Sequence, residues 1–152
     1  MSSTVFVTTG YKNVNSLLRS SKSHGILVTD LARTVLQTSE FLGQKRVVRP
    51  TLLYPDRDLG LSGRVQKEVV QARAAGLVPT TAETAVEFWF RHTSLLNGGV
   101  FCFAGMLPVE FRGDMYIFYL GSTEAGERWV NVTRSSNLCL VSQPWLYERS
   151  SQ

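Results

Sequence analysis

Six basic side chains within residues 45–67 form the group in this sequence that is best suited to bind an anion. Arg guanidinium groups hold phosphates and carboxylates through pairs of hydrogen bonds, and such contacts release counterions from a nucleic acid. Gly60 and Gly63 would let backbone N–H groups approach the anion. Asp56, Asp58 and Glu68 lie among the cations, so a solvated, partly self-paired surface is the alternative. The residues predicted to bind nucleic acid, RNA in preference to DNA, are Lys45, Arg46, Arg49, Arg57, Arg64 and Lys67.

The positive charge is concentrated in the first half of the chain. Residues 1–76 hold eleven Lys and Arg against five Asp and Glu, whereas residues 77–152 hold five against seven. Arg outnumbers Lys twelve to four, and a planar guanidinium suits phosphate or carboxylate better than an ammonium group does. Codon usage can produce the same bias, so the excess favours an anionic or protein partner without identifying it.

The sequence carries no recognisable catalytic or metal-binding motif. His24 and His92 are the only histidines, and no HExxH, CxxC or GxSxG pattern is present. Cys102 and Cys139 lie in apolar runs typical of strands, so two buried thiols are predicted, with a disulfide or a catalytic thiol as alternatives. We therefore expect no metal, no cofactor and a non-enzymatic protein.

Residues 8–27, TTGYKNVNSLLRSSKSHGIL, are faintly similar to the opening of some ADP-ribosyltransferases. In that family a strand, a polar turn and a short helix shape the nicotinamide pocket. The resemblance implies an alternative function, a small transferase-type enzyme with its pocket between the N-terminal strand and the sheet. Tyr11, His24 or a loop glutamate such as Glu124 would then be the reactive group. The family's other motifs have no counterpart that we can place in this chain.

The stretch from Pro79 to Asn97 has the strongest helical pattern. Thr80 and Glu83 are spaced as a capping box, and Gly98 with Gly99 ends the pattern. At 100° per residue most side chains are apolar, and burying them gives roughly 10–20 kcal/mol of gross transfer free energy. The polar stripe is narrow and consists of Glu83, Glu87, Arg91 and Ser94. Residues 81–96 are therefore predicted to form a central helix that is covered on most sides.

The chain before this helix is predicted to contain strands and helices. Residues 3–9 and 45–54 read as strands, the second an edge strand or bent strand because Pro50 interrupts it. Residues 13–20 are expected to form a short helix, and Asp30 is the expected N-cap of a helix that Gly43 ends. Residues 64–75 read as a helix that Gly76 stops, and this helix is predicted to form a hairpin with the central helix.

After Gly99 the helical period gives way to alternation and short apolar runs. Residues 100–104, 107–112, 115–120, 128–133 and 138–142 are predicted to be the strands of an antiparallel meander, with residues 115–120 in mid-sheet. Arg112-Gly113-Asp114 matches an adhesion tripeptide, but the position of Gly113 and Asp114 between two predicted strands favours a two-residue hairpin turn at these two residues. Residues 143–152 are expected to dock for a few residues and then fray.

The predicted sheet carries more aromatic side chains than one helix can cover on both faces. The uncovered face is therefore a candidate subunit interface, and an oligomeric structural subunit is a third possible function. The predicted interface residues are Tyr116, Phe118, Trp129 and Trp145.

The composition is that of one globular domain, with 43% hydrophobic and 18% charged residues in 152. We expect a single α+β domain over residues 1–152: an N-terminal β/α portion and a helix hairpin, then a C-terminal antiparallel sheet of about five strands packed on the central helix. No run approaches the ~20 apolar residues of a membrane span, and no basic segment precedes a long apolar one. Neither membrane insertion nor a cleaved signal is expected. The expected location is cytoplasmic, in the host cytoplasm or the virion if the protein is viral.

The function that these patterns favour is that of a non-enzymatic binding or assembly protein. Its partner would be nucleic acid, with RNA before DNA, or another protein or a second copy of the chain. The contact would be made through the Arg-rich first half. A viral or phage origin is part of this hypothesis, because the sequence shows no familiar family signature.

Overall fold

Four helices and ten strands occur in the residues that the computed structural model describes, which are 7–9, 13–38, 46–53, 64–91, 101–123, 126–135 and 144–149. The helices are α1 (Val14–Ser23), α2 (Asp30–Thr38), α3 (Arg64–Ala74) and α4 (Ala82–Arg91). The strands are β1 (Val7–Thr9), β2 (Ile26–Val28), β3 (Arg46–Val48), β4 (Pro50–Leu53), β5 (Leu77–Val78), β6 (Phe101–Ala104), β7 (Val109–Phe111), β8 (Asp114–Ser122), β9 (Arg128–Arg134) and β10 (Trp145–Arg149). None of these helices is long and apolar enough to cross a lipid bilayer.

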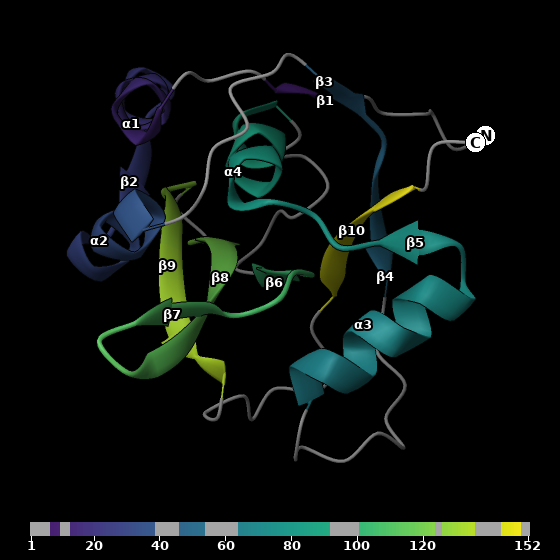
Figure 1. Cartoon of the computed structure of the whole chain (residues 1–152). Helices are drawn as coiled ribbons and strands as arrows, with labels where there is room; N and C mark the ends of the chain where they lie inside the picture. The colour runs from purple at the N-terminus through teal and green to yellow at the C-terminus, as the bar shows by residue number, and fades with distance from the viewer. Residues whose placement is uncertain are drawn as a thin grey trace.

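Eight strands form one large mixed sheet (Figure 1). It runs in the order β2-β9-β8-β6-β10-β4, with β7 paired to β8 and β5 paired to β10. β2 is parallel to β9 and β10 is parallel to β6, whereas β8 is antiparallel to its neighbours. The α+β class is compatible with this arrangement, but the prediction of a five-stranded antiparallel meander is wrong. The chain before the central helix contributes β2, β4 and β5 to the same sheet.

Most of the strands predicted after Gly99 are present. They correspond to β6, β7, β8 and β9, and the predicted strand at residues 138–142 lies outside the described residues. The end of the chain, which was expected to dock and fray, contains β10, which lies between β6 and β4. β3 and β4 are separated at Arg49, just before Pro50, and β4 is the last strand of the order, as predicted for an edge strand. The pairs made by β10 join distant parts of the sequence, so local alternation could not reveal them.

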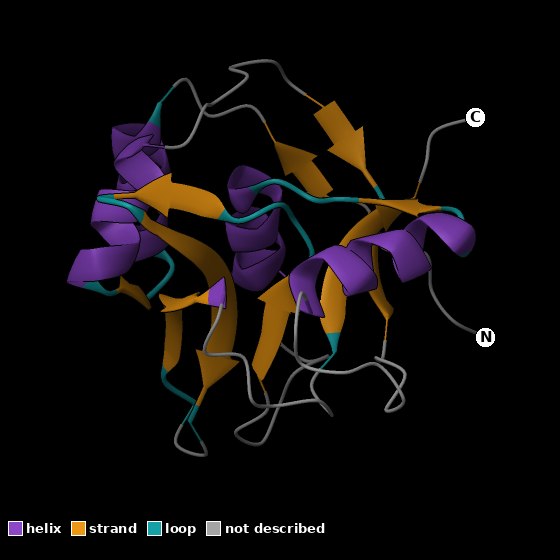
Figure 2. Cartoon of the chain, turned by 60° about the horizontal axis from the view of Figure 1, so that its bottom comes forward, coloured by secondary structure: helices purple, strands orange, loops and turns teal. Residues whose placement is uncertain are grey.

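The sheet has a helix layer on each face. Phe118 and Leu120 of β8 belong to a core that α1, α2 and α4 share, whereas Ile117, which precedes Phe118, belongs to a second core with Val69 and Ala72 of α3. Side chains alternate between the faces of a strand, so these two cores lie on opposite sides of the sheet. Figures 1 and 2 show the same layering. The predicted helix hairpin is therefore wrong: β5 pairs with β10 and carries the chain from α3 on one face to α4 on the other.

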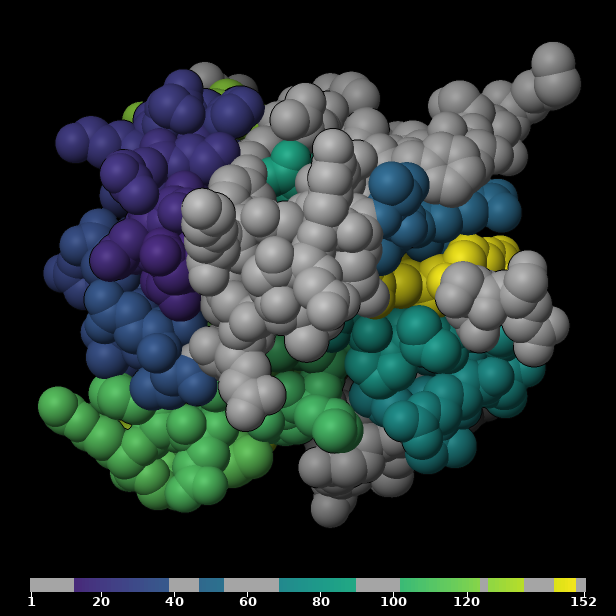
Figure 3. Space-filling model, turned by 45° about the horizontal axis from the view of Figure 1, so that its top comes forward, coloured from purple at the N-terminus to yellow at the C-terminus, as the bar shows by residue number. Residues whose placement is uncertain are grey.

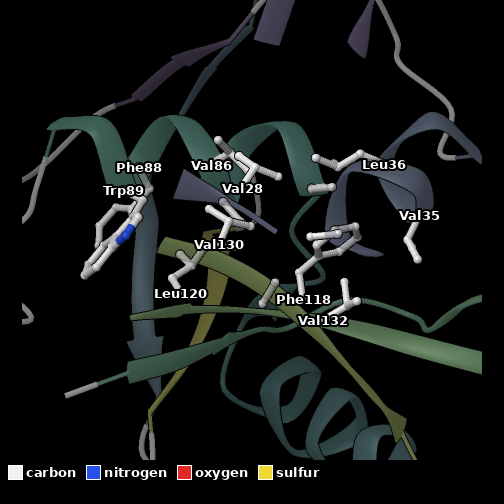
Figure 4. Close-up of a cluster of buried hydrophobic side chains, with 14 of the residues drawn as sticks. Val28, Val35, Leu36, Val86, Phe88, Trp89, Phe118, Leu120, Val130 and Val132 are labelled. Carbon is white, nitrogen blue, oxygen red and sulfur yellow. The ribbon is translucent and has the colours of Figure 1, made fainter. Parts of the chain in front are cut away.

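The central helix α4 has the apolar content that its sequence predicted. Apolar side chains of α4 lie between the helix and the sheet, with those of α2 beside them (Figure 4). Even the predicted polar stripe is covered, because Glu83 and Glu87 are only 6% and 3% exposed, and both make interactions within the protein. β1, which pairs with β3 in a separate two-stranded sheet, packs against this helix. The prediction of a helix covered on most sides is confirmed for residues 82–89, and residues 92–97 lie outside the described part.

The start of α4 differs from the predicted capping box by one residue. The Thr84 amide donates to Thr81 Oγ1 at 3.1 Å, so Thr81 is the N-cap. Thr80 instead donates its backbone N–H to the Gly105 carbonyl at 2.8 Å. That long-range bond fixes Thr80 outside the helix, which a local spacing rule cannot foresee.

A two-residue hairpin turn joins β7 and β8 as predicted, but it lies one residue earlier than the expected pair Gly113 and Asp114. Phe111 pairs with Asp114 across a two-residue loop, and the loop residues Arg112 and Gly113 have φ of 51° and 83°. Two positive φ values give the tight turn that matches the twist of a β-hairpin. The adhesion-like tripeptide thus lies in and beside the hairpin turn, with the Arg112 guanidinium 5.2 Å from the centre of the Phe111 ring.

Candidate anion-binding groove

A groove of about 630 Å³ lies beside strand β2, between α1 and α2. Three cationic side chains line it: Arg19 and Lys22 from α1, and Arg33 from α2. Asn15, Ser21 and Gln37 add polar groups from the same two helices. Its volume falls in the range of about 300–1,000 Å³ that is usual for ligand sites. Basic side chains from two separate helices therefore converge on one hollow.

The spacing of residues on each helix puts these groups on one face. Asn15, Arg19 and Lys22 follow one another at intervals of four and three residues, and Arg33 and Gln37 are four apart, so each set lies along one side of its helix. Asn13 caps α1, accepting the Ser16 N–H at 3.0 Å. Thr29 caps α2 by accepting the Ala32 N–H at 3.3 Å, one residue earlier than the predicted cap at Asp30.

The turn from α1 into β2 is held in place by a hydrogen bond from a side chain of β9. Gly25 has φ of 71°, a conformation that ends the helix and reverses the chain. The Arg128 guanidinium, from β9, donates to the carbonyl of His24 at 3.0 Å and to that of Trp89 at 3.2 Å. One side chain thus joins the end of α1 to α4. This bridge holds α1 in place against the sheet.

The three cations that line the groove have exposed side chains. In the part of the chain that the structure describes, no carboxylate forms an ion pair with Arg19, Lys22 or Arg33. An ion pair between Arg134 and Asp114, at 3.3 Å, joins strands β9 and β8 away from the groove. An anionic ligand would therefore meet three exposed cations at this groove.

The floor of the groove is apolar. Leu18 of α1 and the three residues of β2 line it, and Leu27 is 66% exposed. β2 is the first strand of the sheet order, and β9 is its single partner among the described strands. The groove thus combines a cationic rim, an apolar floor and the edge of a sheet.

The sequence-predicted basic set does not form this groove. Lys45 and Arg57 lie outside the described residues, and Arg46, Arg64 and Lys67 are described in their backbone alone. The Arg49 side chain is exposed between β3 and β4. Arg46 belongs to β3 on the α4 side of the sheet, whereas Arg64 and Lys67 belong to α3 on the other side (Figure 1). Figure 3 shows residues 13–38 on one flank and residues 46–53 on the opposite one.

The predicted aromatic interface is largely used inside the chain. Tyr116 and Phe118 lie in the core under α1, α2 and α4, and Trp145 lies in the core under α3. Their side chains are 8%, 0% and 1% exposed, so these three are buried within the chain. The aromatic excess is explained by a sheet that has helices on both faces, not one. Trp129 is half-buried and meets Tyr119 edge to face, with 5.1 Å between ring centres.

Of the three groups suggested by the transferase resemblance, His24 alone lies in the described residues. Tyr11 and Glu124 lie outside that part of the chain. His24 is exposed, and its Nδ1 lies 2.8 Å from the Ser20 carbonyl at the end of α1. No group of three His, Cys, Asp or Glu side chains that could hold a metal occurs in the described residues.

Cys102 is a buried thiol, as predicted. Burial raises its pKa to about 12, which leaves it protonated and unreactive near neutral pH. Cys139 lies outside the described residues.

Sequence reasoning missed Arg19, Lys22 and Arg33 as a group. The pattern predicted a first helix that ends at Ser20, which left Lys22 in a loop, whereas α1 continues to Ser23. The available signal was the three-residue spacing of Arg19 and Lys22, which places them together if the helix continues. Their convergence with Arg33 depends on β2, which the sequence pattern did not predict.

Comparison of the chain with protein-family models, with curated proteins and with solved structures finds no match.

Proposed function

We propose that this protein is a non-enzymatic binding or assembly protein that holds an anionic partner in the groove between α1 and α2. The observation that carries the proposal is the convergence of Arg19, Lys22 and Arg33, without a paired carboxylate in the described residues, on a groove of about 630 Å³. The contact lies in the basic first half of the chain, and its residues differ from those of the predicted set.

Charge alone gives this site only weak affinity. An exposed ion pair contributes about 0.2–1 kcal/mol, so three such pairs give at most about 3 kcal/mol. A millimolar complex already needs about 4 kcal/mol. A useful partner must therefore also bury apolar surface on Leu18 and Leu27, or span cations beyond the groove. The apolar floor is thus as much a part of the site as the basic rim.

Binding of fluorescently labelled single-stranded RNA, single-stranded DNA and an oligoglutamate peptide, followed by anisotropy from about 50 to 300 mM KCl, tests the proposal. We expect at least one of the three to bind. For a single strand held by three cations, log affinity should fall with log salt concentration at a slope of about −2. The variant Arg19→Glu/Arg33→Glu should lose at least about tenfold in affinity, because it replaces attraction by repulsion within the site.

The matched control is Arg73→Glu/Arg149→Glu. Both side chains are exposed, both lie outside the groove, and the change in net charge is the same. Equal losses in the two double variants would mean that net charge, and not the groove, attracts the anion. Retention of full binding by the groove variant would contradict the proposal.

A further inference from the structure

We propose that the partner in this groove is an extended peptide segment of alternating acidic and apolar residues, which adds to the open edge of β2 as a further strand. This inference rests on the proposed function, because the same three cations attract the segment. It specifies the partner as protein and not nucleic acid.

Some backbone N–H and C=O groups of β2 point away from β9, toward the open edge of the sheet. The Thr29 N–H donates to the Val130 carbonyl at 3.1 Å, and Leu27 stands opposite Trp129 in the parallel register. In a parallel ladder alternate residues bond to the same neighbour, so Leu27 and Thr29 face β9. The N–H and C=O groups of Ile26 and Val28 consequently point to the open edge. No strand among the described residues pairs with them there.

The two faces of the edge offer different surfaces to an added strand. Ile26 and Val28 turn their side chains into the core under the helices, where the groove has its cations. Leu27, which borders the groove at this edge, points its side chain to the other face of the strand and is 66% exposed. Residues of an added strand would alternate in the same way, so one set would meet Arg19, Lys22 and Arg33 and the other would meet Leu27. Acidic residues suit the first set and apolar residues the second.

A nucleic acid fits these surfaces less well. Single strands gain much of their affinity from bases stacked on aromatic rings. None of the described residues that line the groove is aromatic. An RNA strand would use the cations but neither the strand edge nor the apolar floor. Pairing through backbone groups, by contrast, is a common way in which proteins hold extended peptides.

The test uses a fluorescein-labelled eight-residue peptide of alternating Glu and Val, titrated into the full chain and followed by anisotropy. Two modified peptides carry N-methyl groups on the backbone of every Glu or of every Val. In either strand direction only one of these sets has its N–H groups directed at β2. We expect one methylated peptide to lose at least about tenfold in affinity and the other to bind within about threefold of the parent. The variant Arg19→Glu/Arg33→Glu should weaken the parent peptide as well.

The other outcomes contradict either the proposed strand addition alone or the proposed function as well. Equal binding of both methylated peptides would exclude strand pairing, and the peptide would then be held by charge alone. Binding of a single-stranded RNA that the groove variant abolishes, with no binding of the peptide, would overturn this inference and leave the proposed function standing. Absence of binding by the peptide, RNA and DNA at low salt would overturn both.

Discussion

Gly121 on β8 leaves room for the indole of Trp129, which stands opposite it on β9. A Cβ at position 121 would overlap ring atoms of Trp129, whereas a Cβ at Gly113 would meet nothing within 4 Å. Gly113 needs glycine for a different reason, its φ of 83° in the hairpin turn. Position 121 thus requires glycine for steric reasons, and position 113 requires it for its backbone conformation.

Gly121→Ala should therefore destabilise the protein by about 1–3 kcal/mol through overpacking, and Gly113→Ala by about 1 kcal/mol through backbone strain. Urea unfolding measures both. In a Trp129→Ala background the cost of Gly121→Ala should fall by more than half, while the cost of Gly113→Ala should not change. Additive effects at positions 121 and 129 would show that the ring does not limit residue 121.

The Cys102 thiol makes stability depend on alkaline pH. Burial without a compensating charge raises its pKa from 9.0 to about 12. The folded state favours the protonated thiol, so its contribution is complete below about pH 9 and is lost as the pH rises toward 12. Relative to wild type, Cys102→Ala should show a shallower fall in the free energy of unfolding over this interval, by up to about 4 kcal/mol at its end. Parallel curves for the two proteins would show that the thiol is not desolvated.

Sequence rules correctly predicted individual turns and helix ends where these depend on residues that are close in the sequence. The Arg112-Gly113 turn and the stop at Gly76, with φ of 79°, needed only backbone geometry. The cap of α4 did not follow its spacing rule, because the contact between Thr80 and Gly105 comes from a distant strand.

At the scale of elements, the start of α4 gives a direct comparison between two adjacent threonines. Thr81 Oγ1 accepts the Thr84 N–H, while the buried Thr80 Oγ1 has no hydrogen-bond partner among the described residues. Thr81→Val should cost about 1 kcal/mol because it removes the N-cap. Thr80→Val should be neutral or slightly stabilising, because it removes a buried hydroxyl that makes no bond.

Thermal or urea unfolding of the two variants decides which residue is the cap. A larger loss for Thr80→Val than for Thr81→Val would restore the capping box that the sequence spacing predicted.

Helix and strand identities were largely predictable, but their partners were not. The predicted helix pair α3 and α4 is divided between two faces, because β5 joins the sheet beside β10. The predicted terminal tail became β10, a strand with Trp145, Leu146 and Tyr147 buried at 1% exposure or less. The alternation of such residues indicates a strand, but it does not say which strand lies next to it.

At the scale of the whole molecule, the basic first half and the acidic second half are parts of one sheet. β2 pairs with β9 and β4 pairs with β10, so removal of the first half of the chain would take away the strands at both edges of the sheet. The sequence correctly located the positive charge in the first half. It could not show that Arg19, Lys22 and Arg33 converge, because that convergence depends on the pairing of β2 with β9.

The most direct test of an anion site between α1 and α2 is an NMR titration of ¹⁵N-labelled protein with the alternating Glu and Val peptide and, separately, with a short single-stranded RNA. The account predicts that amide shifts concentrate on α1, β2 and α2, with little change in α3 or around Arg49. It also predicts that Arg19→Glu/Arg33→Glu abolishes the shifts. Shifts centred on Arg49 and α3, with α1 and α2 unperturbed, would contradict it and return the anion site to the basic set at residues 45–67.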